Sequence, residues 1–385
     1  MRHGLLGAGF FAVACACSCL GSLDYLGVGG AGNGGAGASG VGGNDAGASS
    51  TGGDAACEEV TSSDNCGACG HSCFGGGCVD GRCQPVVVAS DQDHPFGIGV
   101  DGDHVYWSNR GSRQIMRAPR KGGDAQQIAA STSGAVEFVP GHLVVQPAVV
   151  AWTNEEAGQN GGYALLAWSK AAMGDPSSFA GSSPDGNGGL AAAGDTFYFG
   201  NWGLKAIRTA QLGQENVETI ATEQEAPGRI AVDETHVYWT LEVTAPGGGV
   251  LRMARQPGAT PESLSRGVGE AWGIALDDEF VYVTSVTQVL RIPKVGGPAL
   301  ELANGQIGPT GIAVDDARVF WTSTGAQDAA AGAVLSVAKD GGEDPVVIAS
   351  GQASPFMIAV DDEQIYWTNN GGDVAGAGAV MRVAR

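Results

Sequence analysis

Two stretches of this sequence, one near each end of the chain, are close copies of each other. The stretch QPVVVASDQDHPFGIGVDGDHVYWSN (84–109) aligns without a gap on DPVVIASGQASPFMIAVDDEQIYWTN (344–369), and 14 of 26 positions are identical. Similarity at a constant offset indicates an architecture built from repeated units. Because the two copies lie at opposite ends, the pattern further indicates a ring that the chain's own termini close.

An aromatic strand recurs between the two copies. The position that ends its aromatic pair falls at residues 107, 152, 199, 239, 283, 321 and 367, with spacings of 38 to 47 residues. Units of about 40–50 residues with turns inside them are typical of β-propeller blades. We therefore predict an all-β fold, a closed propeller of four-stranded blades, with seven blades favoured and six as the alternative.

Each unit contains four segments that are expected to be strands. The first is short and apolar, as in Gly311–Asp315; the second carries the aromatic pair; the third alternates, as in Val250–Arg255. The last unit stops after its third strand, whereas Pro85–Ser90 is an outer strand with no unit of its own. We predict that Pro85–Ser90 pairs beside Ala379–Arg385, because this closure would remove two open sheet edges.

The repeated string Ile-Ala-Val-Asp-x-x-x-Val-Tyr-Trp-Thr resembles the YWTD and TolB-like propeller repeats of extracellular and periplasmic proteins. The resemblance covers residues 85–385 and implies a propeller, usually of six blades in those families. It implies no particular ligand.

The first 56 residues have the features of an export signal followed by a linker. Residues 1–26 combine a basic start with an apolar run, Gly4–Ala16, that is too short to span a bilayer. Ala12–Cys15 resembles a bacterial lipobox, which implies a lipid on Cys15; the alternative is ordinary cleavage without a lipid. Residues 27–56 hold 13 glycines and are expected to be disordered.

Residues 57–83 form a cysteine-rich segment ahead of the propeller, which we expect to span 84–385. Six cysteines behind an export signal predict three disulfides, with the pairing open; zinc bound through Cys66 and Cys69 with Cys73 or His71 is the alternative. The segment resembles small Cys-rich units of secreted myxobacterial proteins, which implies no chemistry. The six residues are Cys57, Cys66, Cys69, Cys73, Cys78 and Cys83.

The net charge of −21 argues against nucleic acid as a partner, because phosphate contacts need basic side chains. We expect a monomer that touches a membrane only through an N-terminal lipid anchor. The expected location is outside the cytoplasm, either as an outer-membrane or periplasmic lipoprotein or as an extracellular protein.

No catalytic motif is present, so function is expected in the loops. Arginines recur at one position of the third strand (Arg117, Arg208, Arg252, Arg291 and Arg382), either as an anion-binding ring or, preferably, as strand residues covering a neighbouring blade. The loops between second and third strands offer oxygen ligands for a hard cation such as calcium; the alternative is that these residues only form turns. The metal candidates are Asn109, Glu155, Glu156, Asp328 and Asp373, and otherwise no cofactor is expected.

Two functions are compatible with these features. The preferred one is a non-catalytic binding module of the cell envelope, or a secreted one, that recognises a protein, peptide or glycan through its loop face. The alternative is a metal-dependent hydrolase or lyase, because calcium-dependent lactonases and streptogramin lyases are propellers. The lyases use a histidine in their later blades, and no histidine follows His236 in this sequence.

Overall fold

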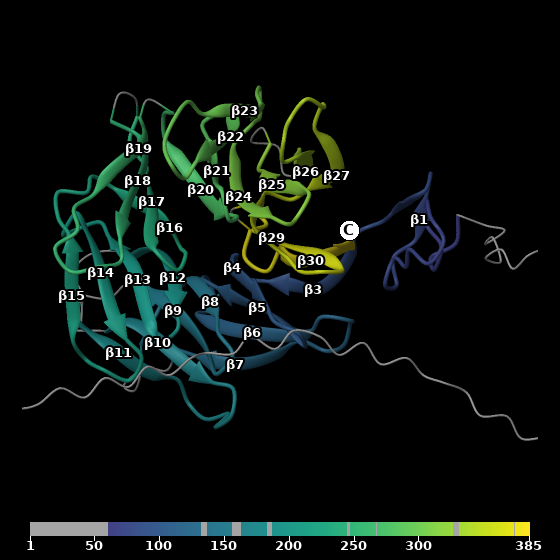
Figure 1. Cartoon of the computed structure of the whole chain (residues 1–385). Helices are drawn as coiled ribbons and strands as arrows, with labels where there is room; N and C mark the ends of the chain where they lie inside the picture. Colours follow the sequence, from purple (N-terminus) through teal and green to yellow (C-terminus); the bar gives the residue numbers. More distant parts are fainter. Residues whose placement is uncertain are drawn as a thin grey trace, which may run out of the picture. The chain divides into compact units, whose positions relative to one another are not determined.

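The computed structural model describes residues 61–131, 137–155, 163–182, 187–244, 247–266, 268–325, 331–372 and 374–385. Over these residues the chain forms thirty β-strands and no helix, arranged as seven four-stranded sheets and one two-stranded sheet. No described segment is therefore a helix that could cross a membrane. The seven sheets are the blades of a propeller, which confirms the predicted fold and the larger of the two blade numbers (Figure 1).

The first four blades each contain four consecutive antiparallel strands, which follow one another from the inner to the outer edge of the blade. Blade 1 has β4 (Pro95–Val100), β5 (His104–Asn109), β6 (Gln114–Pro119) and β7 (Gln126–Ala130). Blade 2 has β8 (Pro140–Val145), β9 (Val149–Asn154), β10 (Tyr163–Ser169) and β11 (Ser177–Ser182). Blade 3 has β12 (Asn187–Ala193), β13 (Thr196–Asn201), β14 (Ala206–Gln211) and β15 (Val217–Ala221). Blade 4 has β16 (Pro227–Val232), β17 (His236–Leu241), β18 (Gly249–Ala254) and β19 (Glu262–Arg266).

The last three blades complete the ring. Blade 5 has β20 (Ala271–Leu276), β21 (Phe280–Ser285), β22 (Gln288–Pro293) and β23 (Leu300–Ala303). Blade 6 has β24 (Pro309–Val314), β25 (Arg318–Ser323), β26 (Gly332–Ala338) and β27 (Val346–Gln352). Blade 7 has β28 (Pro355–Val360), β29 (Gln364–Asn369), β30 (Gly378–Ala384) and, as its outer strand, β3 (Val86–Gln92).

Strand β3 closes the ring from the N-terminal side. It pairs antiparallel with β30, with Val86 opposite Arg382 and Gln92 opposite Gly378. The inner strands contact one another in sequence order, and β28 of the last blade contacts β4 of the first. The predicted pairing of the first strand with the last is therefore confirmed, and it leaves β30 with a partner on both sides.

A buried tryptophan on the second strand holds neighbouring blades together. Trp107, Trp152, Trp239, Trp321 and Trp367 are all fully buried. In four cases, among the described residues, a glutamine at or just after the outer strand of the preceding blade accepts a hydrogen bond from the indole N–H. These pairs are Gln92–Trp107, Gln224–Trp239, Gln306–Trp321 and Gln352–Trp367, at 2.9 to 3.0 Å.

An aspartate just after the inner strand makes a second link between blades. Asp101 accepts a hydrogen bond from the Tyr106 hydroxyl at 2.9 Å and pairs with Lys170 of the next blade at 2.6 Å. Four further pairs repeat this link around the ring: Asp233–Lys294, Asp277–Lys339, Asp315–Arg385 and Asp361–Arg120.

The recurring arginines of the third strand also join blades. Arg252, Arg291 and Arg382 each donate a hydrogen bond to a main-chain carbonyl of the next blade, at Lys294, Lys339 and Arg120 respectively. These three arginines therefore cover a neighbouring blade, which is the preferred of the two interpretations made from the sequence.

The cysteine-rich segment is disulfide-bonded. Cys66 pairs with Cys78 and Cys73 with Cys83, and Cys69 is also in a disulfide. The short strands β1 (Cys78–Val79) and β2 (Arg82–Cys83) pair with each other. Sulfur atoms of three of these cysteines lie within 4.8 Å of one another, but the disulfides use the thiolates that zinc would need. Cys15 and Cys57 lie outside the described residues.

Candidate functional site

The seven inner strands occupy equivalent places, so their residues can be compared position by position. At the third position three strands carry a large side chain: His142 on β8, Arg229 on β16 and Met357 on β28. The other four strands carry Gly97, Gly189, Gly273 and Gly311. In ring order, each large side chain therefore has a glycine at the same position of both neighbouring blades.

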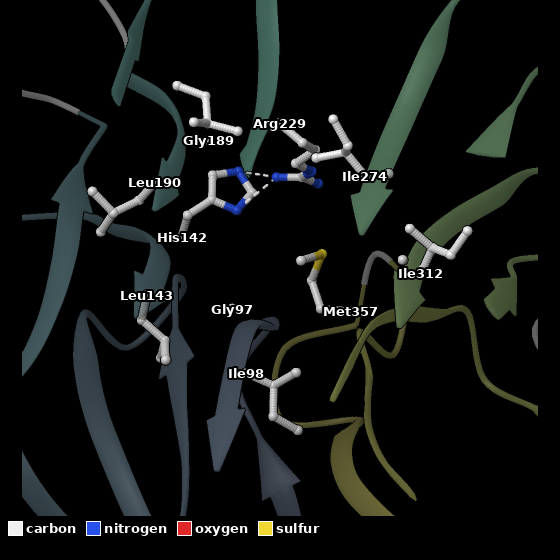
Figure 2. Close-up of a pocket in the computed structure, with 13 residues that line it drawn as sticks. Gly97, Ile98, His142, Leu143, Gly189, Leu190, Arg229, Ile274, Ile312 and Met357 are labelled. Carbon is white, nitrogen blue, oxygen red and sulfur yellow. Dashed lines mark hydrogen bonds between the residues drawn. The ribbon is translucent and has the colours of Figure 1, made fainter. Parts of the chain in front are cut away.

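These residues line a cavity at the centre of the ring, of about 80 Å³. A volume of this size holds a few water molecules at roughly 30 Å³ each. His142, Arg229 and Met357 project toward it from three blades, and leucine and isoleucine side chains such as Leu143 and Ile274 surround them (Figure 2).

His142 and Arg229 meet across the intervening blade 3. Nη1 of Arg229 lies 2.6 Å from Nδ1 of His142 and also contacts its Nε2. Gly189 of blade 3 lies between their strands, where an added Cβ would stand 2.6 Å from the Arg229 Cα. The two side chains are 8% and 9% exposed, so a positive charge is held almost entirely out of bulk water.

Aromatic rings flank the arginine. Phe96 precedes Gly97 and Phe356 precedes Met357, and their ring centroids are 4.8 Å apart. The Arg229 guanidinium carbon lies 5.4 Å from the Phe96 centroid and 5.8 Å from that of Phe356, within the range of a cation–π contact. Phe96 also packs against His142, with centroids 4.9 Å apart.

A ring of side chains follows the second strands at the same end of the cavity. The residue just after the second strand differs from blade to blade, and we call these seven residues the rim. They are Arg110, Glu155, Trp202, Glu242, Val286, Thr324 and Asn370. The rim therefore presents cationic, anionic, aromatic, aliphatic and polar groups on one repeated backbone, and we call the opening that it surrounds the channel mouth.

Several rim residues contact the inner strands. Arg110 lies over the Phe96 ring at 4.6 Å and donates to the Glu155 carboxylate. Glu242 folds over its own inner strand, because a Cβ added to Gly228 would lie 2.6 Å from Glu242 Oε1. Trp202 donates its indole N–H to the Pro227 carbonyl at 2.8 Å, and its side chain remains 48% exposed.

Burial sets the protonation states of the site. It lowers the pKa of His142 well below its usual value, helped by the positive charges of Arg229 and Arg110, so the imidazole is neutral near pH 7. Burial also lowers the pKa of Arg229, to about 10, with Glu242 and Glu155 opposing the shift, so the guanidinium stays charged. Burial raises the pKa of Glu242, Arg229 lowers it and Glu270 adds to the rise.

Only some of the residues that were predicted as metal ligands lie at this site. Glu155 lies in the rim, paired with Arg110. Asn109 instead donates its side-chain amide to Gln92 at 2.9 Å and is buried beside Trp107 in the closure between blades 7 and 1. Glu156, Asp328 and Asp373 lie outside the described residues.

The central residues were not singled out by sequence reasoning. His142 belongs to a unit that matches the repeat poorly, and Arg229 precedes the recognisable Ile-Ala-Val-Asp string of its blade. The signal that could have found them is the glycine at the third position of most inner strands. A side chain that replaces this glycine must project into the ring centre.

Comparison with solved structures identifies the fold. No protein-family model and no curated protein match the chain. A streptogramin B lyase superposes with a TM-score of 0.62 at 13% identity, covering 78% of this chain and 97% of that one. Virginiamycin B lyase from Staphylococcus aureus gives 0.62 at 14% identity, covering 78% and 98%, in a catalytically inactive His-to-Ala variant with quinupristin.

A second kind of protein shares the fold. The extracellular domain of a two-component system from B. thetaiotaomicron gives a TM-score of 0.56 at 13% identity. The match covers 77% of this chain and 39% of that one. At these identities the likeness establishes the propeller alone, because one propeller scaffold carries unrelated functions.

Proposed function

We propose that this chain is an exported, non-catalytic binding module that recognises a protein, peptide or glycan at the channel mouth. The observation that carries the proposal is the buried Arg229–His142 pair, which lines the central cavity beneath the rim. A concave site with mostly apolar walls and a few convergent polar groups is the usual form of a ligand site.

The chemistry of the rim supports recognition. Trp202, Val286 and Ile307 are exposed apolar side chains on the loop face, at 48%, 54% and 58%. Aromatic and arginine side chains dominate the binding energy of protein interfaces, and Trp202 and Arg110 supply both types. Because rigid blades position these side chains, a ligand would bind without a large ordering cost.

The proposed location is the cell envelope or the exterior. Disulfides persist in oxidising compartments, and the cysteine-rich segment contains them. The lipobox-like sequence suggests that Cys15 carries a lipid that anchors the protein to a membrane. Labelling cells with a radioactive fatty acid tests the anchor: we expect label on the wild type and none on Cys15→Ala, and equal label on both would contradict it.

A thermal-shift screen tests the binding function, because a ligand that binds only the native state raises its melting temperature. The screen would use a peptide and glycan library and the full chain. We expect at least one hit whose shift is lost in a double variant, Trp202→Ala with Arg110→Ala. Met173→Ala, at a side chain 60% exposed in the β10–β11 turn, is the control. The control should keep every hit, and hits that all survive the double variant would place binding elsewhere.

A metal-dependent hydrolase or lyase is the second candidate. The specific observation in its favour is that the pKa values of His142 and Glu242 are pushed in opposite directions within one cavity mouth. Such separation is a feature of general acid–base pairs. Turnover of a screening hit, dependent on added calcium and lost in His142→Gln, would move the assignment to this class; binding without turnover supports the binding module.

A further inference from the structure

We propose that Arg229 is the receptor for a carboxylate, and that the ligand of the channel mouth is a monoanionic acid with an apolar or aromatic stem. The inference rests on the proposed function and names the class of ligand for the same site. It follows from the way in which one buried charge is left without a counter-ion.

Arg229 is a buried cation without an ion-pair partner among the residues that the structure describes. Arg229 is 9% exposed, and moving a cation from water to such a place costs several kcal/mol unless an anion offsets it. Among the residues that the structure describes, no carboxylate lies within ion-pair distance of Arg229, and its one side-chain hydrogen-bond partner is the neutral His142. Two acids act on Arg229 through space: Glu155 is paired with Arg110, and Glu242 makes no ion pair with Arg229. A guanidinium has five N–H donors, and His142 engages only Nη1.

A ligand in the central cavity would be able to reach Arg229. Arg229 and His142 both line the central cavity, and Figure 2 shows their side chains meeting there with Met357 nearby. The cavity of about 80 Å³ is large enough for a carboxylate group and too small for a large headgroup. The other lining residues are glycine, leucine, isoleucine and methionine, so an anion that enters finds one strong donor group and, apart from His142, no other polar side chain among the lining residues.

The surroundings of Arg229 favour a ligand with one negative charge and an apolar or aromatic stem. Arginine binds carboxylates through two parallel N–H bonds, and a single arginine suits a single negative charge. Glu242 and Glu155 act on Arg229 through space, and they would repel a phosphate dianion more than a monoanion. Phe96 and Phe356 stand beside the arginine with centroids 4.8 Å apart, so the group next to the carboxylate would contact aromatic carbon.

Two sources share this chemistry, a small aromatic acid and the C-terminal carboxylate of a peptide. Phenylacetate and phenylacetamide form a matched pair for the first source. N-acetyl-glycyl-phenylalanine with a free or an amidated C-terminus forms the pair for the second. Within each pair a carboxylate is replaced by a neutral amide of nearly the same shape, so the difference in affinity measures how much Arg229 favours the carboxylate.

The experiment measures binding of both pairs to the full chain by calorimetry. We expect the acid of at least one pair to bind about tenfold or more tightly than its amide, the range for hydrogen bonds to charged groups. The pair that shows the difference identifies the source. Arg229→Met should abolish the difference, and it should fold normally because methionine occupies the same position of blade 7 at Met357.

Met357→Leu is the matched control, since it alters the same cavity without touching the charge; the preference for the acid should survive. Equal binding of acid and amide, no binding of either acid at millimolar concentration, or a preference that persists in Arg229→Met would overturn the inference. If a screening hit depends on Trp202 and Arg110 but ignores Arg229→Met, the inference fails while the proposed function stands.

Discussion

Arg382 donates a hydrogen bond from Nη2 to the main-chain carbonyl of Phe74, at 2.9 Å. Its Nη1 donates to the Arg120 carbonyl at 3.0 Å and to Gln364 Oε1 at 2.7 Å. One side chain, 5% exposed, thus joins the cysteine-rich segment, the last blade and the first blade at the place where the ring closes. The disulfide-bonded segment is therefore part of the closure.

Replacing Arg382 should destabilise the whole ring. Arg382→Met removes the donor from one buried acceptor, Gln364, and from three partly buried main-chain carbonyls, so we expect a loss of about 2–3 kcal/mol in the free energy of unfolding. Arg117→Met is the matched control from the same strand position, where the side chain contacts the exposed Gln126, the Trp168 ring and the Tyr106 hydroxyl; it should cost less than about 1 kcal/mol. Urea denaturation of both variants measures the difference, and equal losses would contradict the role of Arg382.

Removing the N-terminal strand should open the ring. Deletion of residues 1–91 removes nearly all of β3 and leaves β30 as an unpaired edge, so aggregation or a much lower melting temperature is expected. Deletion of residues 1–56 keeps β3 and the described cysteines and should change the melting temperature little. Light scattering and calorimetry on both truncations decide: if both melt like the full chain, β3 does not hold the ring closed.

Each glutamine that accepts from a tryptophan should stabilise the folded state in proportion to the number of buried donors whose hydrogen bonds it accepts. Gln352 accepts from Trp367 Nε1 and from Asn369 Nδ2, both at 3.0 Å, whereas Gln306 accepts from Trp321 alone. Each unsatisfied buried donor costs about 1–3 kcal/mol. Gln352→Leu is therefore expected to lose roughly 2–4 kcal/mol of unfolding free energy, about twice the loss in Gln306→Leu. A larger loss in Gln306→Leu would refute this interpretation.

The aspartate links make stability depend on acid pH. Burial would raise the pKa of Asp101, but hydrogen bonds from Lys170, two backbone amides and Tyr106 outweigh it and lower the pKa from 3.8 to about 2. The folded state thus binds this proton less tightly than the unfolded state. The stabilisation is complete above about pH 4 and is lost as the pH falls through about 2.

Melting temperatures between pH 5 and pH 2 (roughly the window in which Asp101 titrates) measure this contribution. Asp101→Asn should be less stable than the wild type at pH 5, and the two curves should converge toward pH 2. The exposed Asp124 offers a control, and Asp124→Asn should follow the wild type throughout. Parallel curves for Asp101→Asn and the wild type would show that the Asp101–Lys170 ion pair does not stabilise the folded state.

The fold could be predicted from the sequence because the blades repeat the same pattern of strands and aromatic residues. Trp107 and Trp367 stand in copies separated by nearly the whole chain, and the split repeat around them predicted the β3–β30 pairing. Disulfides were predicted for the cysteine-rich segment, but the pairing of Cys66 with Cys78 and of Cys73 with Cys83 could not be, because six cysteines allow fifteen pairings.

The site was harder to predict because it consists of departures from the repeat. His142 and Arg229 come from blades 2 and 4, and they touch only because the ring brings their strands to one centre and Gly189 leaves room between them. Asn109 was predicted as a metal ligand from its side-chain oxygen, but it ends β5 and donates its amide to Gln92, which joins blade 1 to blade 7.

Methyl NMR on the six methionines tests most directly whether ligands bind at the channel mouth. The chain would be labelled with methionine carrying a 13C methyl group and titrated with N-acetyl-glycyl-phenylalanine or a hit from the screen. Met357 lines the cavity, whereas Met173 is 60% exposed in the β10–β11 turn. We predict that saturating ligand shifts the Met357 methyl resonance and leaves that of Met173 unchanged. Saturable binding that moves Met173 or leaves Met357 unmoved would contradict it.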